Sequence, residues 1–279
     1  MALNFKTLGV RALSALFFVA LLLGSLLWNY YSFSVFFFIV AMIGLGEFYR
    51  LAKKMNAAPY KWTGFILGAF IYFNSIKDIF LSGFWSDAGK TVVTVFPFVV
   101  LAASLFSKKE QAFKNALFTI GGIIYAVLPF TLMHDLVKSS GCFGEGYNPN
   151  ILLGIILLIW SNDTFAYLGG SVFGKNKMIE RISPGKTWEG TIFGVIVTIG
   201  SGYIIGHQIL GENEKMWILL GLIVPVFATI GDLIESMLKR EAGVKDSGNI
   251  MPGHGGILDR FDSLIFVSPF VFLLMDFLK

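Results

Sequence analysis

The chain has 279 residues, of which 55% are hydrophobic and 14% are charged, whereas soluble domains carry about 25% charged residues. This composition and a mean hydropathy of +0.72 exclude an ordinary water-soluble globule. The single cysteine excludes an internal disulfide and a cysteine metal cluster, so any bound metal is expected to have oxygen ligands.

Apolar segments recur along the whole chain and predict an all-α, polytopic integral membrane protein with about nine transmembrane helices. Each segment approaches the length of about 20 residues that a helix needs to cross a bilayer. The expected spans are 11–28, 30–48, 62–76, 91–106, 115–137, 151–168, 190–210, 216–237 and 261–278.

The distribution of lysine and arginine predicts the orientation of these spans, because both residues are enriched in cytoplasmic loops. With nine crossings, 17 of the 22 basic residues lie on the side of the N-terminus and the even-numbered loops. Without the short third span, 62–76, the basic residues divide equally between the two sides. The count therefore favours nine crossings, with the even-numbered loops in the cytoplasm.

Two of these cytoplasmic loops, 162–190 and 232–262, are long, rich in glycine and acidic. Together they contain 9 of the 18 acidic residues. Both belong to the C-terminal region, 151–279, which we therefore expect to be catalytic. The N-terminal region, 1–150, is expected to supply about five transmembrane helices.

Carboxylates in the second loop are spaced to share helix faces. Asp232 and Glu235 lie at i and i+3 near the cytoplasmic end of one expected helix, and Asp259 and Asp262 repeat this spacing at the start of the next. Two antiparallel helices would bring these groups to the same depth. Converging carboxylates without histidine or thiolate partners favour Mg²⁺. The alternative is a set of salt bridges to Lys239, Arg240 and Arg260.

A basic, glycine-rich stretch lies between these carboxylates. Glycines allow backbone N–H groups to approach an anion closely, and lysine and arginine add positive charge. The stretch therefore predicts a polyphosphate site, although glycines alone would fit a simple turn and a lone histidine is more often a hydrogen-bond donor than a base. Its candidate residues are Lys239, Arg240, Lys245, Asp246, Gly253, His254, Gly255 and Gly256.

The first loop offers two further candidates. Asp163 interrupts the span 151–168, and an ionisable residue within a span is a functional-site hypothesis, or else a polar group that a neighbouring helix satisfies. Lys186 follows a Ser-Pro-Gly turn that matches neither a Walker A loop nor a Rossmann fingerprint. We expect Lys186 to bind nucleotide phosphate. Together the two loops predict phosphoryl or nucleotidyl transfer at a membrane surface.

The stretch Ser236–Asp262, with the pattern SMLKR-x4-KD-x-G-x3-PGHGG-x2-DRFD, closely resembles the signature of phosphatidate cytidylyltransferases, also called CDP-diacylglycerol synthases. The segments Asp163–Gly170 and Ser183–Gly190 look like the second conserved region of the same family. The first 150 residues resemble the family only in being hydrophobic helices.

The resemblance implies that CTP and phosphatidic acid react to give CDP-diacylglycerol and pyrophosphate at the cytoplasmic side of a bacterial inner membrane. It also implies Mg²⁺ bound by Asp232 and Asp259, and leaves a second cation and a homodimer open. No nucleic acid partner is expected. The residues expected to be catalytic are Asp232, Lys239, Arg240, Lys245, Asp246, Asp259, Arg260 and Asp262.

Two other functions compete with this interpretation. A CTP-dependent lipid kinase would phosphorylate the hydroxyl of a polyprenol or diacylglycerol, and would need a base to activate that alcohol. An ion-coupled transporter would place polar residues in the middle of several spans and would show internal pseudo-symmetry. The transporter pattern is not visible in this sequence, in which the charges cluster at one membrane face and no repeat is evident. The lipid kinase stays the alternative.

Overall fold

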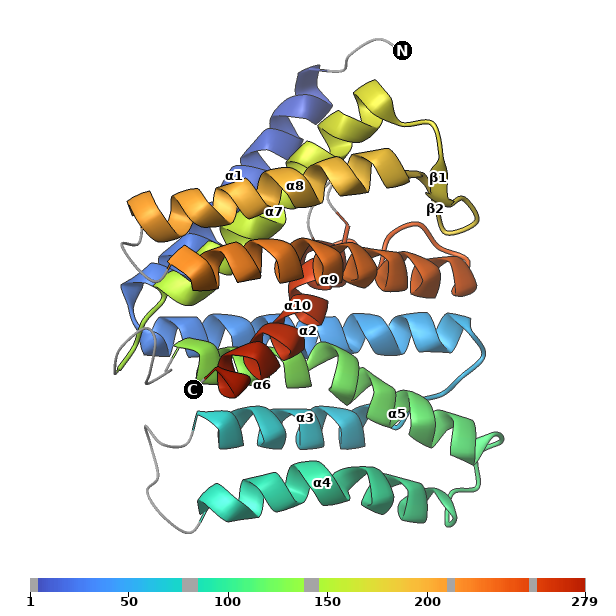
Figure 1. Cartoon of the computed structure of the whole chain (residues 1–279). Coiled ribbons are helices and arrows are strands. Elements are labelled where there is room, and N and C mark those ends of the chain that lie inside the picture. The colour runs from blue at the N-terminus through green and yellow to red at the C-terminus, as the bar shows by residue number, and fades with distance from the viewer. Residues whose placement is uncertain (1–4, 77–84, 138–145, 210–213, 251–254, 279) are drawn as a thin grey trace. The chain divides into compact units, whose positions relative to one another are not determined.

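The computed structural model describes residues 5–76, 85–137, 146–209, 214–250 and 255–278, and it is almost entirely helical (Figure 1). The helices are α1 (Phe5–Trp28), α2 (Tyr30–Lys54), α3 (Lys61–Ser75), α4 (Trp85–Ser104), α5 (Ala112–Ala126), α6 (Leu128–Val137), α7 (Asn150–Phe173), α8 (Trp188–Ile204), α9 (Glu214–Glu241) and α10 (Leu258–Phe277).

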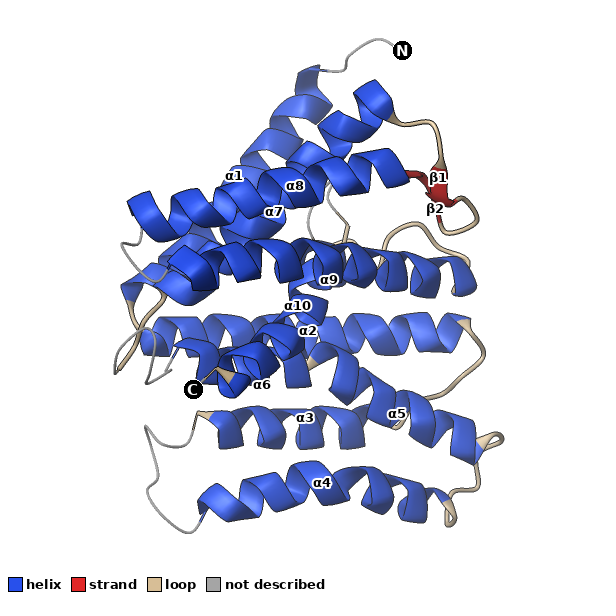
Figure 2. Cartoon of the chain, in the orientation of Figure 1, coloured by secondary structure: helices blue, strands red, loops and turns tan. Residues whose placement is uncertain are grey.

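The predicted all-α fold class is confirmed, and within the described residues the only strands form one short ribbon (Figure 2). Strands β1 (Lys177–Ile179) and β2 (Ser183–Thr187) pair antiparallel, with Lys177 opposite Thr187. The sequence analysis did not predict this ribbon, which lies inside the first motif loop.

Each expected span coincides with a helix, but the count of nine crossings is not confirmed. Five described segments are long and apolar enough to cross a membrane: Tyr30–Lys54, Ala112–Val137, Asn150–Phe173, Trp188–Gln208 and Glu214–Glu241. The 15 residues of α3 rise by only about 22 Å, less than the about 30 Å of a bilayer core. The assignment of α3 as a crossing therefore stays a prediction.

The expected single span 115–137 consists of two helices. Helix α5 ends at Ala126 and α6 begins at Leu128, one residue before Pro129. Proline has no backbone N–H and its ring clashes with the preceding turn, which explains a break at this place. The span expected at 190–210 likewise ends in a π-helical turn, Ile205–Ile209.

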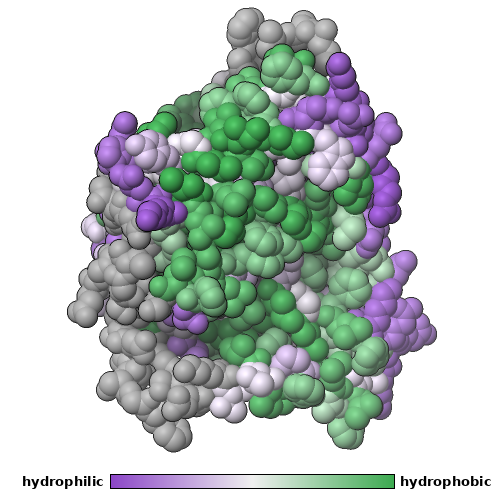
Figure 3. Space-filling model, viewed as in Figure 1, coloured by the Kyte–Doolittle hydropathy of each residue, from purple (hydrophilic) through white to green (hydrophobic). Residues whose placement is uncertain are grey.

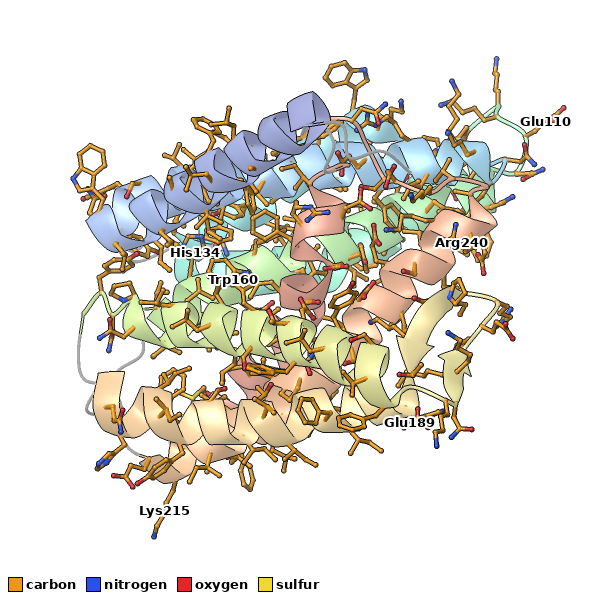
Figure 4. The ribbon with its side chains drawn as sticks, turned by 90° about the horizontal axis from the view of Figure 1, so that it is seen from above. Glu110, His134, Trp160, Glu189, Lys215 and Arg240 are labelled. Carbon is orange, nitrogen blue, oxygen red and sulfur yellow. The ribbon has the colours of Figure 1, made fainter. Side chains whose placement is uncertain are left out.

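By its internal contacts the chain divides into two compact units, each built from two stretches of sequence. The first unit contains Met1–His134 and Glu241–Arg260, so the central part of the signature segment belongs with the N-terminal helices. Its core contains fully buried Phe33, Phe37 and Phe130. His134, labelled in Figure 4, is also buried and lies within hydrogen-bond distance of the Tyr30 and Tyr72 hydroxyls.

The second unit contains Asp135–Arg240 and Phe261–Lys279. Helices α7 and α8 lie side by side in it (Figure 1). Their close approach depends on glycine, because a Cβ atom at Gly190 would lie 2.6 Å from the carbonyl oxygen of Ala166 and 2.8 Å from the Cα of Gly170. Two glycines of the first motif loop therefore serve helix packing.

Large apolar side chains remain on the visible surface of the helices (Figure 3). Among the large apolar side chains of the described residues, Phe17, Trp62, Phe98 and Ile196 are each more than half exposed. Apolar side chains that are exposed on long helices are expected in a protein surrounded by lipid, because they then contact lipid tails and not water. This surface agrees with the prediction of a membrane protein.

Candidate active site

Three carboxylates converge where α9 meets α10 in the second unit. One oxygen each of Asp232, Glu235 and Asp262 lies within 4.8 Å of the other two. Asp232 and Glu235 share a face of α9, as the i, i+3 spacing predicted, and Asp262 comes from the first part of α10. The sequence analysis had expected Glu235 and Asp262 to lie at the same membrane depth as Asp232, but it had assigned neither of them to the metal.

A glycine next to Asp232 brings the two helices together. A Cβ atom at Gly231 would lie 2.6 Å from the Cβ of Phe266 and 2.7 Å from the carbonyl oxygen of Asp262. Side-chain atoms do not approach so closely, so a larger residue would push α9 away from α10. The Ser263 hydroxyl also donates to the carbonyl oxygen of Ala228 across this contact, at 3.3 Å.

Two lysines balance part of the negative charge. The Lys186 ammonium lies 2.6 Å from Oδ2 of Asp232, whose Oδ1 accepts a hydrogen bond from Ser236 at 3.2 Å. Lys239 forms an ion pair with Glu235, one helical turn before it. Glu235 is fully buried, so its charge requires such a partner. Lys186 and Lys239 thus both lie at the carboxylates.

The donor set fits a hard divalent cation. Three carboxylates offer only oxygen ligands, which Mg²⁺ prefers, and Mg²⁺ commonly leaves further positions to water and substrate phosphate. Carboxylates that are this close repel one another, so a cation between them would relieve the repulsion.

A cavity of about 370 Å³ adjoins the carboxylates and lies entirely within the second unit. This volume is within the range of about 300–1,000 Å³ that is typical of small-molecule sites. Its polar walls include two acidic residues and one basic residue; among the lining residues are Asp163, Lys186, Asp232, Ser183, Thr187 and Tyr167. Asp163 and Lys186, predicted from separate parts of the first loop, therefore line the same cavity as Asp232.

The ribbon holds Lys186 at this cavity. The Thr187 hydroxyl caps α8 by accepting a hydrogen bond from the Gly190 N–H at 3.2 Å. The Glu189 carboxylate accepts hydrogen bonds from the backbone N–H groups of Lys175 and Asn176, which closes the loop before β1. Figure 4 shows Glu189 beside the ribbon. Lys186 thus lies on the paired strand β2, directly before the residue that caps α8.

Arg240, near the C-terminal end of α9, reaches the same ribbon (Figure 4). Its Nε donates to the carbonyl oxygen of Ile182 at 3.3 Å. Ile182 directly precedes β2, so this contact links the end of α9 to the loop that carries Lys186. The contact is a positioning contact; whether Arg240 also meets a substrate stays a prediction.

Asp259 belongs to the first unit, where backbone and hydroxyl donors surround it. Its Oδ2 accepts hydrogen bonds from the Ser247 N–H and hydroxyl, both at 2.8 Å, and from the Gly256 N–H at 2.7 Å. Gly255, with φ +81°, makes the turn before this contact. The N–H of Gly256, a residue of the expected polyphosphate site, therefore donates to a carboxylate of the protein. The expectation that Asp259 binds Mg²⁺ stays a prediction.

The remaining candidates are solvent-exposed or not described. Lys245, Asp246 and Arg260 are exposed. Gly253 and His254 lie outside the described residues.

One residue of this region was missed entirely. Glu47 of α2 is fully buried and contacts the signature segment through Ser247 and Leu258. The signal was present in the sequence, since Glu47 is an acidic residue within an otherwise apolar stretch. It was overlooked because no function was assigned to the first 150 residues.

Comparison with known proteins identifies the family of the chain. The model of the cytidylyltransferase family matches residues 9–278. A phosphatidate cytidylyltransferase of Haemophilus influenzae is 31% identical over 93% of this chain and 96% of its own length, and one of Staphylococcus haemolyticus is 33% identical over 95% and 98%.

A phosphatidate cytidylyltransferase of Staphylococcus aureus is 41% identical over 184 residues, and there the chain spans 66% of the relative's length. The resemblance seen in the signature is thereby confirmed. The chain belongs to the cytidylyltransferase family.

Proposed function

We propose that the chain transfers CMP from CTP to phosphatidic acid. A phosphate oxygen of phosphatidic acid attacks the α-phosphorus of CTP, a P–O bond to that phosphorus forms, and the bond between the α-phosphorus and the bridging oxygen of the β-phosphate breaks. The products are CDP-diacylglycerol and pyrophosphate. Because the attacking oxygen is already an anion near neutral pH, no strong general base is required.

The observation that carries the proposal is the cavity of the second unit, bordered by Asp232 and Lys186 and adjoining the three carboxylates. Its chemistry suits a polyphosphate with a bound cation. The apolar helices supply access to a lipid substrate, and the related proteins named phosphatidate cytidylyltransferase act on that lipid by name.

The residues have separate tasks in this reaction. Lys186 binds nucleotide phosphate at the cavity wall, and its pairing with Asp232 keeps it there before CTP arrives. Asp232, Glu235 and Asp262 would hold Mg²⁺, with Asp259 a further proposed ligand from the signature. When bound, the ion stabilises the charge that develops on the transferred phosphorus and the leaving pyrophosphate.

Transfer is tested with purified full-length protein, phosphatidic acid in mixed micelles, and CTP labelled with ³²P in either the α- or the γ-phosphate. The α-label is expected in the lipid phase and the γ-label in the aqueous phase as pyrophosphate. A lipid kinase given diacylglycerol or a polyprenol would produce the opposite distribution. Retention of both labels as CTP would overturn the proposal.

We also propose that this site faces the cytoplasm of a bacterial inner membrane. The orientation predicted from basic residues places the ribbon of the first motif loop inside and the start of α9 outside. Lys175 and Lys215 are both exposed, and Lys215 points outward from α9 (Figure 4).

The orientation is tested with Lys175→Cys and Lys215→Cys, each in a Cys142→Ser background. In intact cells a membrane-impermeant thiol reagent is expected to label the cysteine at position 215 and to spare the one at position 175. Both should react after the membrane is opened with detergent, which controls for accessibility. The reverse pattern in intact cells would exclude the proposed orientation.

A further inference from the structure

Glu47 lies in α2, a helix that is long and apolar enough to cross a membrane. Its side chain is fully buried, and its neighbours Leu45 and Tyr49 are fully buried as well. A carboxylate in such a place is costly unless other groups donate hydrogen bonds to it. The partners of Glu47 therefore indicate what it does.

One partner is Arg50 of the same helix, whose guanidinium lies 3.4 Å from Oε1 of Glu47. The other partners come from the signature segment, about 200 residues later in the chain. Oε2 of Glu47 accepts a hydrogen bond from the Leu258 N–H at 2.9 Å, and it lies 3.0 Å from the Ser247 hydroxyl, whose single hydrogen it shares with Asp259. Leu258 is the first residue of α10, so its N–H has no acceptor within that helix. Glu47 thus caps α10 from another helix.

Two glycines of the signature fit against this carboxylate. A Cβ atom added at Gly248 or Gly256 would collide with the carboxylate oxygens of Glu47. At residues 248 and 256 the backbone therefore lies against the Glu47 carboxylate, and a larger residue at either position would have to displace that carboxylate. Gly248 and Gly256 thus belong to the contact with α2.

Ser247 connects Glu47 to Asp259. Its hydroxyl lies 3.0 Å from Oε2 of Glu47 and 2.8 Å from Oδ2 of Asp259, and its N–H donates to the same Asp259 oxygen at 2.8 Å. Gly256 adds a third donor to that oxygen. The carboxylate of Asp259 is consequently held by two residues that rest on Glu47.

We infer that Glu47 is a positioning residue, which holds Ser247, Gly256 and the start of α10 so that the Asp259 carboxylate is fixed for cytidylyl transfer. The inference deepens the proposed function and rests on it. It assigns a task in the reaction to the N-terminal region, through geometry and without contact with either substrate.

Two substitutions separate positioning from a direct role of the charge. Glu47→Gln keeps the length of the side chain and one oxygen acceptor but removes the charge. Glu47→Asp keeps the charge but shortens the side chain by one methylene group, which moves the acceptor away from its donors. We expect kcat to fall no more than about threefold in Glu47→Gln, because a neutral acceptor only weakens these bonds. In Glu47→Asp we expect a loss of at least about tenfold, since a shift of about 1 Å can cost about a hundredfold.

Tyr49→Phe is the matched control. It removes another buried hydrogen bond of α2, from the Tyr49 hydroxyl to the carbonyl oxygen of Thr119 at 2.9 Å, without touching the signature. Its kcat is expected to equal that of the wild type even if its thermal stability falls. A greater loss in Glu47→Gln than in Glu47→Asp would overturn the inference, as would equal activity of all three variants.

Hydrogen exchange measured by mass spectrometry tests the contact independently of activity. In detergent-solubilised full-length protein, the amides of Ser247, Gly256 and Leu258 should exchange faster in Glu47→Asp than in Glu47→Gln, Tyr49→Phe or the wild type. Unchanged exchange in Glu47→Asp would refute the positioning contact. If the wild type fails to transfer the α-label while the exchange result holds, the proposed function fails and the structural contact stands.

Discussion

Replacing Asp232 by asparagine is expected to lower kcat for cytidylyl transfer by about a hundredfold to a thousandfold, the cost typical of losing one preorganised electrostatic contact to a transition state. Asparagine keeps the size of the side chain but removes its charge. Asp232 is the only acidic residue that belongs to the three-carboxylate cluster and also lines the cavity, among the residues described for the second unit. Its loss would weaken both the cation site and the anchor of Lys186.

The measurement is kcat as a function of Mg²⁺ concentration, with thermal unfolding in detergent as a check on folding. Glu180→Gln is the matched control, because Glu180 is an exposed acidic residue of the same unit, beside the ribbon. It should leave both quantities unchanged. Near-normal turnover of Asp232→Asn at low Mg²⁺ would contradict the metal assignment.

Replacing Lys186 by methionine is expected to raise KM for CTP more than about tenfold, which corresponds to about 1.4 kcal/mol of lost binding. Methionine keeps an unbranched side chain but removes the ammonium that lines the cavity and lies 2.6 Å from Asp232. A contact that holds CTP equally in the ground and transition states affects KM and leaves kcat nearly unchanged.

The control is Lys177→Met on the paired strand, since Lys177 is exposed and does not line the cavity. Both constants should match the wild type in that variant. An unchanged KM with a collapsed kcat for Lys186→Met would instead place this lysine at the reacting phosphorus.

The positions of the helices were predictable from the sequence because the length and polarity of an apolar run are local properties. Helical periodicity also predicted that Asp232 and Glu235 lie on the same face of a helix. The family was predictable as well, because the order of residues from Ser236 to Asp262 identifies it. The break before Pro129 also had a local cause, although the sequence analysis did not use it.

What depends on contacts between distant residues was decided only by the tertiary structure. Spacing brought Asp259 and Asp262 to one helix face, but only the packing of α9 on α10 placed Asp262 with Asp232 and Glu235. Gly256 was expected to bind phosphate, yet it lies against the Glu47 carboxylate, which a Cβ atom at this position would approach within 2.5 Å. Glu47 and Ser247 are 200 positions apart, and hydrophobic patterning carries no information about which buried carboxylate meets which hydroxyl. Such pairings follow from the geometry of the folded chain, because a buried charge is satisfied by whatever donors the packing brings to it.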